Sequence, residues 1–107
     1  MDIYMLNTTL TGKLLSEVLS RKLSIKGFIT LERGSDKKTS EYYDYTEFCK
    51  EQGLDCIYLK TYECSDPEDR VKLMELKMDI IIVAGWQRLI PEWLIMHCSI
   101  GVIGAHG

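Results

Sequence analysis

An uninterrupted apolar run, DIIIVAG at residues 79–85, is the feature that most limits how this chain can fold. Its β-branched residues do not alternate with polar ones, so neither face of a strand built from them suits water. A strand of this kind is typical of a parallel sheet that helices cover on both sides. The run therefore predicts a fold of the α/β class.

Strands and helices alternate along the rest of the chain. Short apolar runs predict further strands, and apolar residues at helical spacing, together with N-cap residues, predict helices. The predicted strands are 3–6, 25–30, 56–59, 79–85 and 100–104, and the predicted helices are 10–23, 44–53, 65–78 and 91–98. This alternation predicts one domain, 1–107, with a Rossmann-like, doubly wound parallel sheet of order 3-2-1-4-5 in three α/β/α layers.

Local signals mark the helices. Asp44 is a predicted N-cap and Gly53 a predicted helix stop, while Ser65 or Asp66 should cap the helix that has Pro67 in its first turn. The first helix should carry a single apolar stripe of Leu10, Leu14, Leu15, Val18, Leu19 and Leu23. Residues 32–41 are polar and charged, which predicts a loop.

Composition excludes several classes of protein. The 107 residues carry a formal net charge of −3, which gives no electrostatic footprint for nucleic acid. No run of 18 apolar residues is present, and the opening MDIYML is not a signal peptide. The four cysteines are scattered without a C-x-x-C motif. Reduced thiols in a cytoplasmic protein are the expectation, with a disulfide as the alternative.

Ligands of open parallel sheets bind outside the carboxyl ends of the strands, where three segments fall. They are NTTLTG (7–12), GWQRLI (85–90) and GAHG (104–107). The first has neither G-x-G-x-x-G nor a Walker A lysine, so it is not a phosphate cradle of known type. The two histidines and four cysteines show no spacing suited to a metal, so no metal is expected.

Each candidate site residue also has a purely structural interpretation. Trp86 either covers the core or faces a ligand, and Arg88, taken alone, is a solvated surface charge. His106 follows a strand, where catalysis is common, although a lone histidine is more often structural or simply exposed. His97, beside Cys98, is interpreted as a helix-end residue.

Taken together, DIIIVAGWQRLIPEWLI…GVIGAHG resembles the N-terminal half of the folate-dependent formyltransferase domain. The match is specific over residues 79–107 and is one of topology before that. The resemblance implies 10-formyltetrahydrofolate as the formyl donor. It places the loop Trp86, Gln87, Arg88, Leu89 and Ile90 against the pterin, mainly through main chain and packing. His106 falls on the catalytic histidine of the family.

Gly104 departs from the family pattern, because most members have a catalytic asparagine there. Charge builds on the formyl oxygen during transfer, and one well-placed hydrogen-bond donor is worth a few kcal/mol. Glycine leaves only backbone N–H groups for this task, while a histidine can also move protons. The aspartate and the loop that follow in the family lie beyond residue 107. The resemblance therefore implies a domain cut at its active site, and the 107-residue chain alone is expected to be inactive.

The segment NTTLTG also lacks the glycine-rich phosphate loop of the purine-pathway members. The expected acceptor amine is thus an amino-sugar nucleotide or methionyl-tRNA rather than glycinamide ribonucleotide, with tRNA left open. The alternatives are a non-catalytic Rossmann-like module that binds folate or a nucleotide, and a fragment with an assembly role. Residues IGVIG carry no charge and no proline, which predicts a homo-oligomer that buries 91–107; a tail that folds back would leave a monomer.

Overall fold

The structure of the protein is a computed structural model that describes residues 1–32, 42–61, 63–86 and 89–104. Its elements are β1 (Ile3–Asn7), α1 (Lys13–Lys22), β2 (Ile25–Leu31), α2 (Thr46–Gln52), β3 (Asp55–Leu59), α3 (Pro67–Met74), β4 (Ile80–Gly85), α4 (Glu92–His97) and β5 (Gly101–Gly104). Strand and helix alternate as the sequence predicts. From residue 33 on, the predicted loop 32–41 lies outside the described residues.

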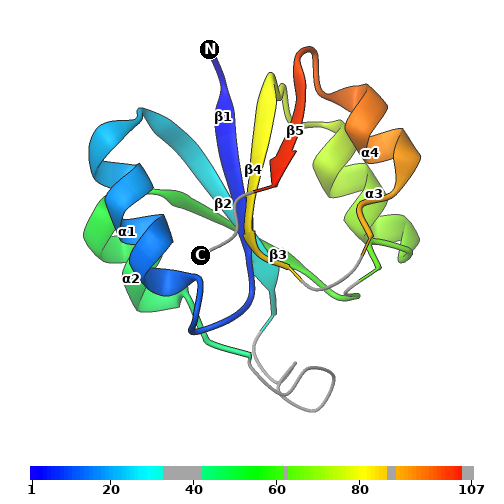
Figure 1. The fold of residues 1–107 in the computed structure, drawn as a ribbon. Helices are drawn as coiled ribbons and strands as arrows, with labels where there is room; N and C mark the ends of the chain where they lie inside the picture. Colours follow the sequence, from blue (N-terminus) through cyan, green and yellow to red (C-terminus); the bar gives the residue numbers. More distant parts are fainter. Residues whose placement is uncertain (33–41, 62, 87–88, 105–107) are drawn as a thin grey trace.

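The five strands form one sheet of order β3-β2-β1-β4-β5, and every pair is parallel. Figure 1 shows α1 and α2 on one side of this sheet and α3 and α4 on the other. The three-layer α/β/α architecture and the strand order 3-2-1-4-5 are therefore confirmed. The prediction succeeds because right-handed crossovers leave few ways to arrange parallel strands of this spacing.

Each face of the sheet has its own hydrophobic core, because successive strand residues point to opposite sides. Tyr4 and Leu6 of β1 belong to the cluster under α3 and α4, which also holds Leu94 and Trp86. Met5, between them, belongs to the cluster under α1 and α2. The second cluster is rich in aromatic rings, whose members are Phe28, Tyr45 and Phe48.

The apolar stripe predicted for the first helix is only partly correct. Leu15 and Leu19 pack against the second cluster, but Leu10 is 58% exposed and Leu14 is 71% exposed. Val18 and Leu23 are exposed as well. The inward face instead includes Ser16, which is fully buried and donates its hydroxyl to the carbonyl of Gly12. A small polar residue at this position lets the helix lie close to the end of β1.

The helix signals are mostly confirmed. Asp66 is the N-cap of α3 and accepts a hydrogen bond from the backbone N–H of Glu68 at 2.8 Å. Gly53 adopts the left-handed conformation, φ 69°, that ends α2. Tyr45 rather than Asp44 occupies the N-cap position of α2, although Asp44 Oδ1 accepts from both the N–H and the hydroxyl of Thr46.

All four cysteines are free thiols, at positions 49, 56, 64 and 98. Within the described residues, no helix is long and apolar enough to cross a membrane. Because none of the four cysteines is disulfide-bonded, the two hydrophobic cores, and no covalent crosslink, hold the fold together.

Candidate functional site

The carboxyl ends of β1, β4 and β5 meet at one edge of the sheet. Asn7 of β1 is paired with Gly85 of β4, and Gly104 of β5 is paired with Val83 of β4. The segments that start at residues 7, 85 and 104 therefore begin side by side, as the sequence predicts. This edge is where an open parallel sheet places its ligands.

The segment after β1 is closed by its own side chains. Asn7 Nδ2 donates to Ser16 Oγ at 2.9 Å and to the hydroxyl of Tyr45 at 2.8 Å, while Asn7 Oδ1 accepts from the N–H of Thr9 at 3.1 Å. The Tyr45 hydroxyl donates in turn to the carbonyl of Thr9 at 2.5 Å. All of these groups are buried. Burial raises the pKa of Tyr45, so the phenol stays protonated and keeps donating.

Two glycines let this cluster form. A Cβ atom on Gly85 would lie 2.1 Å from Asn7 Oδ1, and one on Gly12 would lie 2.5 Å from both Asn7 Nδ2 and the carbonyl oxygen of Ala84. Thr8 also ties the segment to β4, since its N–H donates to the carbonyl of Gly85 at 3.0 Å. Asn7 thus packs closely against Gly12 and Gly85 where β1 leads into α1.

The loop after β4 is described in part. Trp86 is 8% exposed and belongs to the core cluster under α3 and α4, which is the structural interpretation of this residue. Ile90 is half-buried against the same cluster, whereas Leu89 is 93% exposed. Gln87 and Arg88 lie outside the described residues. The contact of this loop with a pterin stays a prediction.

Gly104 is the last residue of β5 and is exposed at the carboxyl edge. His106, the predicted catalytic residue, lies outside the described residues. The structure therefore places the strand that leads to the histidine beside the strand that leads to Trp86, and the role of the histidine stays a prediction.

His97 ends α4, as expected for a helix-end residue, and its Nε2 lies 2.7 Å from the carbonyl oxygen of Leu76. Among the described residues, no group of three or more histidine, cysteine or acidic side chains could hold a metal ion. A surface hollow of about 370 Å³ lies along β3 and α3, lined by Cys56, Ile57, Tyr58, Lys72, Glu75 and Leu76. None of the residues that line this hollow belongs to the three segments of the predicted site.

Sequence reasoning missed two buried polar features at this edge. Ser16 and Tyr45 complete the Asn7 cluster, and only the position of Ser16 between Leu15 and Leu19 could have signalled its inward direction. Asp69 of α3 is fully buried, and its carboxylate accepts from the N–H groups of Lys60 and Thr61. It fixes the end of β3 against α3, so we interpret Asp69 as a structural residue.

The strand order and the three layers define a class: an α/β domain with a doubly wound parallel sheet. The solved structure of phosphoribosylglycinamide formyltransferase from Streptococcus pneumoniae TIGR4 matches this chain with a TM-score of 0.70 and 14% sequence identity. The match covers 98% of this chain and 56% of that chain, so this chain spans little more than half of its length.

Sequence comparisons add nothing to this structural match. No family model matches the chain, and no curated protein matches it. At 14% identity, the structural match establishes the fold and not the activity.

Proposed function

We propose that the chain forms the folate-binding portion of a formyltransferase, which transfers a formyl group from 10-formyltetrahydrofolate to an acceptor amine. The observation that carries the proposal is the structural match over 98% of the chain, combined with the sequence resemblance over residues 79–107. Exposed Leu89 and half-buried Ile90, next to buried Trp86, offer an apolar surface at the carboxyl edge. Such a surface suits one face of a pterin ring.

The bound folate supplies the formyl group; the chain positions it and manages one proton. Transfer forms a C–N bond to the acceptor amine and breaks the C–N bond to the folate, while the amine loses a proton and the folate nitrogen gains one. In our proposal His106 accepts and returns that proton. Since Gly104 has no side-chain donor, backbone N–H groups stabilise the charge on the formyl oxygen.

The closed β1–α1 segment bears on the acceptor. Asn7, held by Ser16 and Tyr45, fills the position between β1 and α1, and Gly12 and Gly85 pack against it. This arrangement supports an amino-sugar nucleotide or methionyl-tRNA as acceptor over glycinamide ribonucleotide. The free thiols of all four cysteines agree with a proposed cytoplasmic location.

Calorimetric titration with a reduced folate tests the proposal. We expect saturable binding by the native chain and about tenfold weaker binding by Leu89→Asp, because burying a leucine side chain contributes about 1.5–3 kcal/mol. Met96→Asp is the matched control: Met96 is 76% exposed near the end of α4 and should not affect binding.

Absence of folate binding by the folded native chain, or equal weakening by both variants, would contradict the pterin assignment. If folate binding is intact but a longer form of the chain with His106→Ala transfers formyl groups at the native rate, His106 does not have the proposed catalytic role. If folate binding is intact and the longer form with native His106 transfers no formyl group, the non-catalytic binding module is favoured over the enzyme. The two results separate a wrong ligand from a wrong catalytic role.

A further inference from the structure

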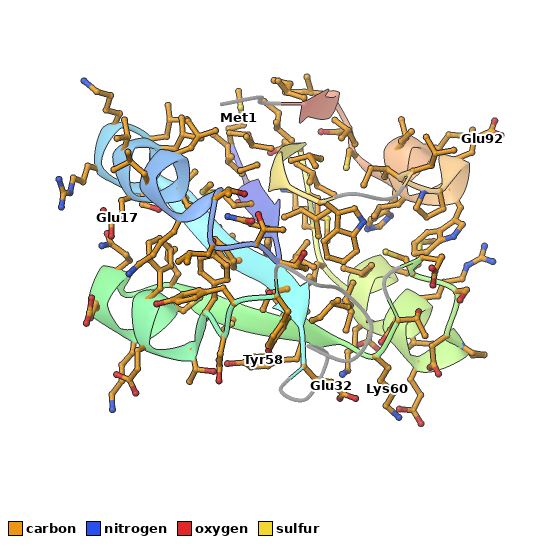
Figure 2. The ribbon with its side chains drawn as sticks, turned by 60° about the horizontal axis from the view of Figure 1, so that its bottom comes forward. Met1, Glu17, Glu32, Tyr58, Lys60 and Glu92 are labelled. Atoms are coloured by element: carbon orange, nitrogen blue, oxygen red, sulfur yellow. The ribbon has the colours of Figure 1, made fainter. Side chains whose placement is uncertain are left out.

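The outer edge of β3 carries a stretch of open backbone. Within the described residues β3 pairs with β2 alone, so no strand lies on its other side. Backbone groups of successive strand residues point alternately to the two edges, and the carbonyl of Leu59 points toward β2, where it accepts from the N–H of Glu32 at 2.9 Å. The backbone groups of Cys56 and Tyr58 therefore point outward. Tyr58 and Lys60, labelled in Figure 2, lie at the lower border of that view.

Two side chains of α3 close this edge at its carboxyl end. The carboxylate oxygens of Asp69 accept from the N–H of Lys60 at 2.8 Å and 3.0 Å. Lys72 donates its ammonium to the carbonyl of Tyr58 at 2.9 Å. The part of the edge that stays open therefore consists of both backbone groups of Cys56 and the N–H of Tyr58.

The surface hollow of about 370 Å³ lies beside this open stretch, between β3 and α3. Ile57 and Leu76, which line it, are partly buried and pack against the core cluster under α3 and α4. Lys72 and Glu75 also line the hollow and are exposed. The hollow thus offers apolar contact with charged groups at its rim, next to strand backbone that has no partner strand.

The ammonium of Lys72 can still bind an anion. Among the described residues no ion pair includes Lys72. A lysine ammonium has three donors, and the hydrogen bond to the carbonyl of Tyr58 uses one of them. Two donors of a positively charged group therefore remain at the point where the open stretch of β3 ends.

We propose that this edge binds the C-terminal segment of a partner protein, extended and parallel to β3, with an apolar last residue and a free carboxylate. Strand addition of this kind takes its affinity from main-chain hydrogen bonds and its specificity from pockets for side chains. In a parallel pair, the N–H and the carbonyl of Cys56 bond to the residues before and after the one opposite it. The residue after it lies beside Ile57, so its side chain points to the same face as Ile57 and enters the hollow.

The closed end of the edge selects the end of a chain. A segment that ran on past Tyr58 would meet backbone groups that Lys72 and Asp69 already occupy. A terminal carboxylate at this point instead accepts from the N–H of Tyr58 and from the ammonium of Lys72, and charge-assisted hydrogen bonds are the stronger kind. Glu75, at the same rim, repels a second acid, so the last residue is apolar rather than acidic.

Calorimetric titration tests the proposal with a short acetylated peptide that ends in leucine with a free carboxylate, and with the same peptide ending in a carboxamide. We expect saturable binding of the acid at millimolar peptide and about tenfold weaker binding of the amide, because the amide lacks the charge that Lys72 binds. Lys72→Met should lower the affinity for the acid to that for the amide. Lys22→Met is the matched control: Lys22 is exposed in the last turn of α1, and its loss should leave the preference for the acid unchanged.

NMR spectra of the native chain locate the peptide, even if Lys72→Met fails to fold. We expect the acid to shift the amide signals of Cys56, Tyr58 and the facing residues of α3. No saturable binding by the folded native chain, equal binding of the acid and the amide, or shifts confined to other elements would overturn the proposal. Because none of the residues that line the hollow belongs to the segments of the proposed folate site, failure of this proposal leaves the folate proposal standing, and the reverse also holds.

Discussion

At the scale of single residues, Asn7 determines the character of the carboxyl edge. Its amide donates to Ser16 and Tyr45 and accepts from Thr9, so three of the four hydrogen bonds that an asparagine side chain can form are made within the protein. A buried polar network of this kind is strongly stabilising only while every member is satisfied. Asn7 therefore acts here as structure, at a position where related sheets often hold a ligand.

Replacing Asn7 with alanine should destabilise the chain by about 3 kcal/mol, because each buried polar group left without a partner costs about 1–3 kcal/mol. Tyr45→Phe should cost about 1–2 kcal/mol, since it removes the hydroxyl and keeps the ring in the aromatic cluster. Urea unfolding of both variants and of the double variant measures the coupling. We expect the double variant to lose less than the sum of the two single losses.

Ser24→Ala is the control for this set, because Ser24 is exposed in the turn before β2 and should change stability by less than about 0.5 kcal/mol. Strictly additive losses for Asn7→Ala and Tyr45→Phe would show that the two side chains do not act as one network.

Residues also show where sequence reasoning stops. The sequence left Trp86 with two roles, and the structure places it in the core with Leu94 and Cys98. A tryptophan after a buried strand suits either role, because its ring is apolar and its N–H is polar. Packing decides between such roles. The packing of Trp86 depends on the position of α4, which no local sequence pattern reveals. Ser16 and Asp69 were missed for the same reason: their partners come from other elements.

At the scale of elements, the type and order of the strands and helices were predictable from the sequence. The lengths of the helices and the side chains that they turn toward the core were less predictable. The predicted helix 65–78 ends at Met74, and the predicted helix 10–23 begins at Lys13. Both helices were predicted too long, because apolar residues in the adjoining turns fit the same helical spacing. Strands were easier, since a run such as 79–85 has no alternative face to choose.

The α3 cap offers a direct test at this scale. Asp66→Ala should destabilise the chain by about 1 kcal/mol, because it removes the carboxylate that accepts from the N–H of Glu68 at the start of α3. Ser65→Ala is the matched control, since Ser65 is exposed and is the neighbour that the sequence could not distinguish from Asp66. The measurement is the midpoint of chemical unfolding for each variant. Equal losses of stability from both substitutions would show that Asp66 is not the N-cap of α3.

At the scale of the whole molecule, the two edges of the sheet differ. The β3 edge begins with the exposed charge of Asp55, and Lys72 reaches across it to the carbonyl of Tyr58. The β5 edge, Gly101–Gly104, has no charged side chain, and within the described residues no strand pairs with its outer side. Charged side chains are a usual protection of edge strands against pairing, and β5 lacks them.

Apolar side chains add to this difference. Ile103 is 53% exposed and pairs with Ile82, which places it on the α1 and α2 side of the sheet. On that same side α1 exposes Leu14 and Val18. An exposed apolar surface beside an unprotected strand favours association. A second copy of the chain suits this edge, since two identical strands can pair antiparallel about a two-fold axis.

We therefore propose a homodimer through β5, and Ile103→Lys tests it. Light scattering at tens of micromolar should find a dimer for the native chain and a monomer for Ile103→Lys, because a charge at the strand pair is poorly solvated there and is repelled by its symmetry mate. Val71→Lys adds the same charge to α3, outside residues 91–107, where Val71 is 57% exposed, and should leave the dimer intact. A native chain that stays monomeric at these concentrations, or a dimer that tolerates Ile103→Lys, would show that β5 is not the interface.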